Sequence, residues 1–461
     1  MSILAGFMVP HPPMIVPEIG RGSEKQILET IEAYEKVADE VAKLSPDTLI
    51  ITSPHSVMYA DYFHISPGRS ATGSFGRFGA PNVSFSENYD EDLVNRICGL
   101  ADAEELGAGV LGEKDPELDH GTMVPLWFIR KKYTQGKIIR IGLSGLPFAE
   151  HYRLGQLIAK AVEDAGISAV FIASGDLSHK LQDYGPYGFA KEGPEYDEKI
   201  MDVCGRGAFG ELFDFSESFC DRAAECGHRS FVIMAGAFDG LGVKAKALSH
   251  QDVTGVGYGI CTFYPTGKDD GRHFLKAYSD RILQECRERA EKSDEYVKLA
   301  RASVESWVLR RQQIPVPEGL PEEMLNRRAG AFVSIHKYGA LRGCIGTIMA
   351  TKGCIAEEII KNAISACSDD PRFDPITEDE LSGLEISVDI LGELEAIDSP
   401  EELDVKRYGV VVSYGMRRGL LLPNLDGVDT VEDQIRIARQ KGGIRENEPY
   451  KLERFEVVRH Y

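Results

Sequence analysis

Three histidines follow short apolar runs whose composition is that of buried strands, and a fourth precedes another apolar segment. His11 follows "ILAGFMV" and His55 follows "TLIITSP". His179 follows "AVFIASGDLS", and His120 precedes an apolar segment in "PELDHGTMVPLW". Any one of them could be an ordinary hydrogen-bonding residue, but four in similar contexts favour one shared site. Two imidazoles and a carboxylate hold non-haem Fe(II) with open positions for substrate and dioxygen, and a further histidine can act as an acid or base.

The carboxylate for such a site has one good candidate in the sequence. Glu225 lies in "DRAAECGHRSFVIMAGAFDG", before a glycine and a helix rich in apolar residues. The alternative interpretation is a solvated glutamate at a helix end. Cys226 and His228 are close neighbours and are also possible ligands.

The elements around these residues alternate between helix and strand. Apolar residues recur at steps of three and four in "EKQILETIEAYEKVADEVAKL", which predicts an amphipathic helix. The runs "DTLIITS", "GKIIRIG" and "ISAVFIA" predict buried strands, and the last two are separated by the helical "HYRLGQLIAKAVEDAG". This alternation predicts an α/β fold with a largely parallel or mixed sheet and helices on both faces. Ligands of such folds bind outside the carboxyl ends of the strands, where the histidines lie.

The composition changes near "FYPTGKDDGRH", where glycine, proline and aspartate cluster. A charged helical stretch follows, and then short strands and turns. We therefore predict a first domain over residues 1–270, a linker over 271–289 and a smaller α+β domain over 290–461.

Charge and composition limit the classes of partner. The net charge is −21, which disfavours nucleic acid and anionic membranes as partners. No apolar run is long enough to span a bilayer, and no signal peptide is apparent, so we expect a cytoplasmic protein. The nine cysteines are scattered and form no CxxC pair, which is typical of reduced thiols.

Five short motifs of the first domain resemble one known family. The segments "VPHPP", "TSPHS", "LDHGTMVPL", "SGDLSH" and "AAECGHRSF" occur in the order found in the LigB-like class III extradiol dioxygenases, and the resemblance covers about residues 3–265. That family uses Fe(II) and O2 to cleave catechol-type rings, so the resemblance implies an aromatic diol or aminophenol substrate, with Zn(II) able to occupy the site after purification. It implies that His11, His55 and Glu225 are the metal ligands. It also implies that His179 is the acid–base residue and that His120 lies near the substrate and oxygen.

The Memo proteins share this fold and much of the site, but their third ligand is a cysteine. Glu225 and Cys226 are adjacent here, so either could be the third ligand. Carboxylate suits ferrous iron, which favours Glu225, whereas a thiolate is softer and favours copper or a redox role. The alternative function is therefore a Memo-like metal-binding or redox accessory protein without ring-cleavage activity.

The C-terminal part resembles a second family. The segments "LRGCIGT", "SACSDDPRFDPIT" and "GMRRGLLLP" are similar to the AMMECR family domain over about residues 290–461. Its Arg342, Cys344 and Asp374 are candidates for a groove that binds a partner or small ligand, and the alternative is a tight turn with a buried cysteine. This domain often occurs with a Memo-like protein and a radical-SAM enzyme (the AmmeMemoRadiSam system), which implies a radical-SAM protein partner.

Overall fold

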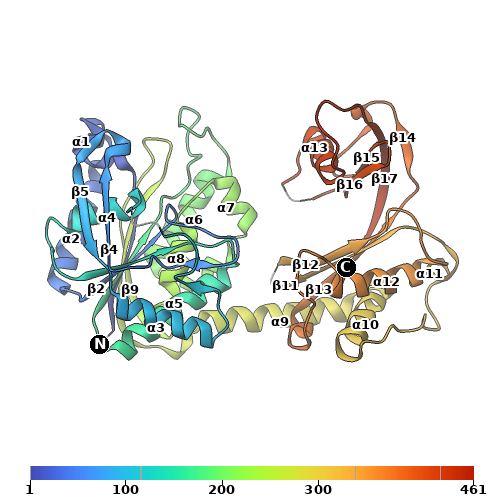
Figure 1. Ribbon diagram of the computed structural model, residues 1–461, viewed down its shortest axis with the longest axis horizontal. Helices are drawn as coiled ribbons and strands as arrows, with labels where there is room; N and C mark the ends of the chain where they lie inside the picture. Colours follow the sequence, from blue (N-terminus) through green and yellow to red (C-terminus); the bar gives the residue numbers. More distant parts are fainter. Residues whose placement is uncertain (1, 115–116, 338, 426) are drawn as a thin grey trace. The chain divides into compact units, whose positions relative to one another are not determined.

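The computed structural model describes residues 2–114, 117–337, 339–425 and 427–461. The chain divides into two compact units, Met1–Tyr278 and Ser279–Tyr461 (Figure 1). Helix α9 (Phe274–Lys292) runs through the boundary, so most of the predicted linker, residues 271–289, is helical. No helix in the described part of the chain is long and apolar enough to cross a membrane.

The first unit contains a six-stranded mixed sheet. Its strands, in spatial order, are β7 (Lys137–Gly142), β2 (Thr48–Ser53), β8 (Ala169–Ser174), β1 (Ile3–Val9), β10 (Tyr258–Lys268) and β9 (Leu241–Gln251). The first four are parallel, and β10 runs antiparallel to both of its neighbours. Every residue of β2 and β8 is buried, which explains their unbroken apolar sequences. The predicted mixed α/β sheet is confirmed.

Helices cover both faces of this sheet and enclose two apolar cores. One face packs against α2 (Leu28–Leu44) and α4 (His120–Ile129). The other face packs against α3 (Glu91–Ala103), α5 (Phe148–Ala165), α6 (Glu192–Arg206) and α8 (His228–Gly236). The shorter helices are α1 (Pro17–Gly20) and α7 (Glu217–Ala223). The unit is therefore a three-layer α/β/α domain.

The strand order places three loops side by side. β8 lies between β2 and β1 and is parallel to both, so the carboxyl ends of these three strands are adjacent. A separate hairpin of β4 (Ser70–Phe75) and β5 (Ala80–Asn88) is joined by the short 3-10 turn Gly76–Phe78. A second small pair consists of β3 (Phe63–His64) and β6 (Ala108–Gly109).

The second unit is an α+β domain with an antiparallel sheet, as predicted. Its strands, in spatial order, are β12 (Ala340–Gly346), β11 (Ala331–Lys337), β13 (Leu384–Leu391), β17 (Lys451–His460), β15 (Tyr408–Tyr414) and β16 (Arg417–Leu421), and β14 (Glu395–Ile397) also pairs with β17. Helices α10 (Glu295–Arg310), α11 (Glu322–Asn326) and α12 (Ile355–Ser368) pack near β11–β13, and α13 (Val431–Lys441) packs on β15 and β16. Each half of the sheet therefore has an apolar core, and Leu391, Val411 and Phe455 form a third, smaller cluster.

Candidate metal centre

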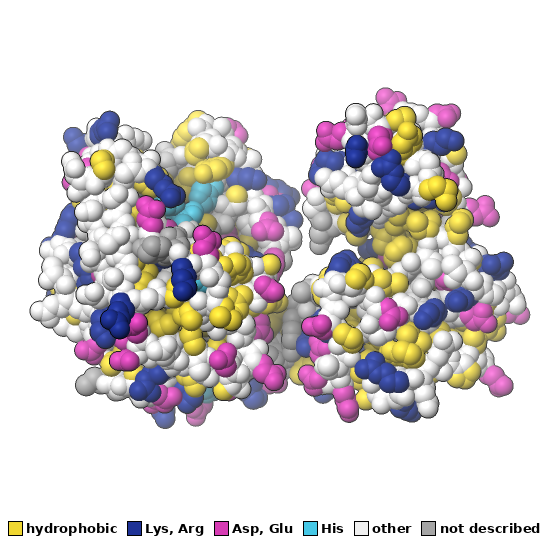
Figure 2. All heavy atoms as spheres, in the orientation of Figure 1, with side chains coloured by type: hydrophobic (Ala, Val, Ile, Leu, Met, Phe, Trp, Pro, Cys, Tyr) yellow, Lys and Arg dark blue, Asp and Glu magenta, His cyan; other side chains and the backbone are white. Residues whose placement is uncertain are grey.

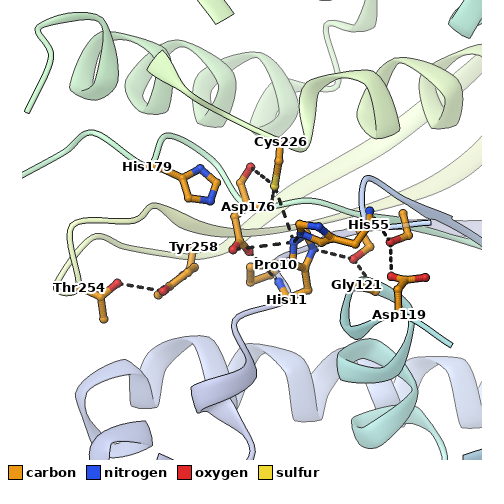
Figure 3. Close-up of polar contacts among 12 residues, drawn as sticks. Pro10, His11, His55, Asp119, Gly121, Asp176, His179, Cys226, Thr254 and Tyr258 are labelled. Atoms are coloured by element: carbon orange, nitrogen blue, oxygen red, sulfur yellow. Dashed lines mark hydrogen bonds and ion pairs between the residues drawn. The ribbon is translucent and has the colours of Figure 1, made fainter. Parts of the chain in front are cut away.

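His11 is buried in the loop after β1, and its surroundings determine which ring nitrogen is free (Figure 3). Its backbone N–H donates to Asp176 Oδ1 at 2.7 Å, and its Nδ1 lies 3.0 Å from Ser174 Oγ. The Ser174 hydroxyl donates its one proton to the carbonyl oxygen of Gly121 at 2.6 Å. Nδ1 of His11 must therefore be the donor to Ser174, and Nε2 of the neutral ring carries a lone pair.

The loop around His11 is held by proline and by a buried tyrosine. Pro10 and Pro12 flank the histidine and restrict the backbone φ at both positions. The Tyr34 hydroxyl of α2 donates to the carbonyl oxygen of Pro10. Pro10, Pro12 and the Tyr34 hydrogen bond thus hold the backbone on either side of His11 in place.

His55 lies in the loop after β2, and its ring meets that of His11. The two Nε2 atoms are 3.0 Å apart, and the rings are nearly perpendicular with centroids separated by 4.8 Å. The backbone N–H of His55 donates to Ser53 Oγ, and the Ser53 hydroxyl donates to Asp119 Oδ1 at 2.5 Å. Two imidazole nitrogens that face each other at this distance could both bind one metal ion.

Cys226 completes a group of three ligand atoms. Its Sγ lies 3.7 Å from His11 Nε2, and the ligand atoms of His11, His55 and Cys226 lie within 4.8 Å of one another. A second group, formed by Asp176, His179 and Cys226, meets the same criterion and shares the thiol. Burial, with the nearby charge of Asp176, raises the pKa of the Cys226 thiol. Two imidazoles and a thiol are donors that suit Zn(II), Fe(II) or copper, so the residues present fit a single transition-metal ion.

Glu225 does not join this cluster. Its Oε2 accepts a hydrogen bond from the backbone N–H of His228 at 2.6 Å, at the first turn of α8. Burial raises the pKa of this carboxyl to about 7. The structure places Cys226, and not Glu225, with the two histidines, so it is the alternative ligand named in the sequence, and not the favoured one, that faces them. The preceding residue, Ala224, has a left-handed backbone (φ 53°), and this turn decides which of the two neighbours faces the histidines.

His228, the other neighbour considered in the sequence, is buried away from the cluster. Its Nε2 lies 3.1 Å from the Leu212 carbonyl oxygen, and its Nδ1 lies 3.3 Å from the Tyr196 hydroxyl. Burial lowers its pKa to about 3. His228 is therefore a core residue.

His179 lies in the loop after β8, on the other side of Asp176 and Cys226 from His55 (Figure 3). Its Nδ1 donates to the carbonyl oxygen of Ala224 at 2.5 Å, which leaves Nε2 of the neutral ring as an acceptor. The structure thus brings the predicted acid–base histidine to the edge of the cluster, beside Asp176 and Cys226.

His120 is the first residue of α4, and the helix start positions it. Asp119 is the N-cap and accepts a hydrogen bond from the Thr122 backbone N–H at 3.0 Å. The His120 ring stacks on His55 with centroids 4.0 Å apart. Burial, with the neighbouring His55 and His11, lowers the pKa of His120 to about 4, so this ring is neutral at pH 7.

Sequence reasoning missed two supporting groups, Asp176 and the Arg140–Asp119 pair. Asp176 follows β8 directly and contacts both His11 and Cys226. Arg140 is wholly buried in β7, where its Nη1 donates to the Glu117 carbonyl oxygen at 2.7 Å and lies 3.5 Å from Asp119 Oδ2. The arginine inside the apolar run "KIIRIG" could have indicated the Arg140–Asp119 pair, because a buried charge needs a specific partner.

The candidate residues of the second unit are near one another, but their polar groups bond to the protein. Arg342 donates to both carboxylate oxygens of Glu380 at 3.0 Å and to the Asp374 carbonyl oxygen at 2.7 Å. The Cys344 backbone N–H donates to Asp370 Oδ2, and its Sγ accepts a hydrogen bond from the Ser334 hydroxyl at 3.2 Å. A surface cavity of about 580 Å³ in this unit lies along α13, and none of the three candidates lines it.

The first domain is a three-layer α/β/α protein, and a group of His, Cys and Asp side chains that could hold a metal ion lies at the carboxyl ends of its parallel strands. Residues 5–261 match the family described as "Catalytic LigB subunit of aromatic ring-opening dioxygenase". The chain belongs to this family through its first domain, and residues 297–460 match the AMMECR1 family.

Two relatives and one solved structure are similar to all or part of the chain. Protein CA_C1420 of Clostridium acetobutylicum is 41% identical over 100% of this chain and 99% of its own length. A Thermotoga maritima protein is 50% identical over 36% of this chain and 96% of its own length. The crystal structure of protein PH0010 from Pyrococcus horikoshii is 30% identical, covers 37% of this chain and 91% of its own, and has a TM-score of 0.35.

Proposed function

We propose that the first domain is a non-haem Fe(II) enzyme that opens a catechol-type ring with O2, acting on an aromatic diol or aminophenol. One observation carries the proposal: beside the ligand-type cluster of His11, His55 and Cys226 lie two histidines, His120 and His179, that are not needed to hold the ion. Membership of the LigB family supports the same reaction class. Zn(II) can occupy the same donors in purified protein.

His11, His55 and Cys226 would hold the ion, and the Asp176 carboxyl would lie beside it. Asp176 Oδ2 lies 3.9 Å from His11 Nε2, and burial raises the pKa of this carboxyl. When bound, the ion would supply Lewis acidity that lowers the pKa of a ring hydroxyl.

The two remaining histidines would handle protons. His179 offers its Nε2 as a base because its Nδ1–H is donated to Ala224, so it can accept a proton from a ring hydroxyl and return it later. His120 is held neutral, so it orients a polar group by hydrogen bonding without adding a positive charge beside the ion.

The test is anaerobic reconstitution of the full chain with Fe(II), followed by O2 and a panel of catechols and aminophenols. Ring-opened products are read by absorbance and mass spectrometry. His179→Gln is expected to keep its iron and lose about 100-fold or more of the turnover. The matched control is His273→Gln, because His273 is exposed and bonded to Asp239. An iron-loaded chain that opens no ring in the panel would contradict the proposal.

A second candidate is favoured by the position of Cys226. A thiolate is a softer ligand than a carboxylate and suits copper or a redox role. On this alternative the chain is a Memo-like metal or redox accessory protein that works with a radical-SAM partner and opens no ring. Tight Cu(I) binding that disappears in Cys226→Ala, together with no turnover by the iron form, would favour it.

A further inference from the structure

We propose that Phe78 and Tyr187 are the substrate-positioning walls of the metal site and select a flat aromatic ring. The inference rests on the proposed function, because it concerns the ring that would bind at the cluster. Neither residue belongs to the histidine and cysteine set, and both are expected to change the Kd of an aromatic ligand.

Each wall packs against one of the two histidines that are not needed as ligands. The Phe78 ring lies edge-on to His120, with centroids 5.4 Å apart and planes at 64°. The Tyr187 ring lies edge-on to His179, with centroids 5.1 Å apart and planes at 88°. The His120 ring stacks on His55, whereas His179 lies on the other side of Asp176 and Cys226 from His55 (Figure 3), so each aromatic ring adjoins a histidine at a different part of the site.

Both rings are exposed although they adjoin a buried polar cluster. Phe78 is 37% exposed and Tyr187 is 60% exposed, while His11 is 1% exposed. Figure 2 shows histidine side chains in a hollow of the first unit, bordered by both hydrophobic and charged side chains. An aromatic ligand in this opening would bury part of both rings and gain from edge or face contacts with them.

The two walls come from separate elements, each fixed by local structure. Phe78 ends the turn between β4 and β5, and Gly79 follows with a left-handed backbone (φ 80°). Tyr187 lies in the loop between β8 and α6. That loop is closed by the bridge between Leu181 and Phe189 and tied by a Gln182–Asp252 hydrogen bond of 3.2 Å.

The experiment compares two chelators that differ in aromaticity, on the metal-loaded full chain without oxygen. The first is 4-nitrocatechol, whose absorbance changes on chelation, and the second is acetohydroxamate, a chelator without a ring. Phe78→Ala and Tyr187→Ala are each expected to raise the Kd of 4-nitrocatechol about tenfold and to leave the Kd of acetohydroxamate within about twofold. Tyr187→Phe is expected to bind as the unchanged protein does, because the proposal uses the ring and not the hydroxyl.

Two neighbours serve as matched controls. Arg77 precedes Phe78 in the same turn and is ion-paired with Glu117 at 3.4 Å. Tyr184 is 73% exposed on the same loop as Tyr187, and it makes no ring contact with a histidine among the residues that the structure describes. Arg77→Ala and Tyr184→Ala should leave both Kd values unchanged. Phe78→Leu removes the aromatic ring but keeps an apolar side chain in the turn, so it should weaken 4-nitrocatechol binding as Phe78→Ala does.

The outcomes separate this inference from the proposed function. Weaker binding of 4-nitrocatechol alone supports the walls, even if the iron form opens no ring. Unchanged Kd values in both alanine variants overturn the walls, even if the unchanged protein turns over a catechol. Equal weakening of both chelators also overturns the inference, because it would mean that the substitutions disturb the ion. An unchanged protein that binds no 4-nitrocatechol overturns it as well.

Discussion

The histidine cluster of the first domain lies in loops at strand ends, whereas the Arg342–Cys344 motif of the second domain lies within strand β12, and the polar atoms of the two groups differ in what they contact. In the cluster, the Nε2 atoms of His11 and His55 face each other at 3.0 Å, beside the thiol of Cys226. In the second domain, Arg342 and Glu380 are joined by two hydrogen bonds of 3.0 Å. Ligand-type atoms that face one another indicate a binding site. A hydrogen-bond donor and acceptor that satisfy each other within the protein indicate a structural role.

The largest expected effect is the loss of the ion from the cluster. His55→Ala removes one of two facing imidazole nitrogens, so the metal content of the purified protein should fall from about one ion per chain to near zero, as measured by plasma mass spectrometry. His273→Ala, which removes an exposed histidine paired with Asp239, should keep the full content. Equal metal content in the two variants would mean that the cluster is not the site.

The second effect concerns the stability of the second domain. Burial alone would raise the pKa of Glu380, but hydrogen bonds from Arg342, Thr377 and Lys337 lower it to about 2. The folded pKa therefore lies below the ordinary value of 4.5, so the stabilisation is present above about pH 4.5 and is lost as the pH falls toward 2.

Glu380→Gln should accordingly lower the free energy of unfolding by about 2 kcal/mol at pH 7, a figure reduced from the full shift to allow for solvent screening. Denaturant unfolding at several pH values measures this, and the difference between the two proteins should shrink toward pH 2. A difference that is constant with pH would contradict the ion-pair account. The metal content of the Glu380→Gln variant should equal that of the unchanged protein.

A smaller effect is expected from the thiol of the second domain. Cys344→Ser keeps a hydrogen-bond partner for the Ser334 hydroxyl and leaves the backbone bond to Asp370 intact. The free energy of unfolding should change by less than about 1 kcal/mol, and the metal content should be unchanged. If metal were lost in this variant, the contrast between the two regions would fail.

The smallest effect is expected from removing the second domain. A fragment of residues 1–278 contains every residue of the cluster and both apolar cores of the first unit. It should bind one ion per chain with the affinity of the full protein, as measured by competition with a chromophoric chelator. A folded fragment without the ion would show that the second domain contributes to the centre.

Much of this arrangement follows from the sequence, because strand periodicity and loop position are local properties. The apolar runs before His11, His55 and His179 predicted both the sheet and the edge at which these side chains meet. The capping of the helix at Asp119, which positions His120, was not predicted from the sequence.

The third ligand could not be decided in the same way. Glu225 and Cys226 are neighbours, and which of them faces the histidines depends on the left-handed turn at Ala224 and on the start of α8. Chemical preference for a carboxylate favoured Glu225, but the carboxylate is instead bonded to the N-terminus of the helix. The pairing of Arg342 with Glu380 was equally hidden, because it joins residues 38 positions apart.

The central claim is that Cys226, and not Glu225, holds the ion with His11 and His55. X-ray absorption spectroscopy of the zinc-loaded full chain tests it most directly. The account predicts one sulfur neighbour at about 2.3 Å that disappears in Cys226→Ala and persists in Glu225→Gln. A spectrum with only nitrogen and oxygen neighbours in the unchanged protein would contradict it.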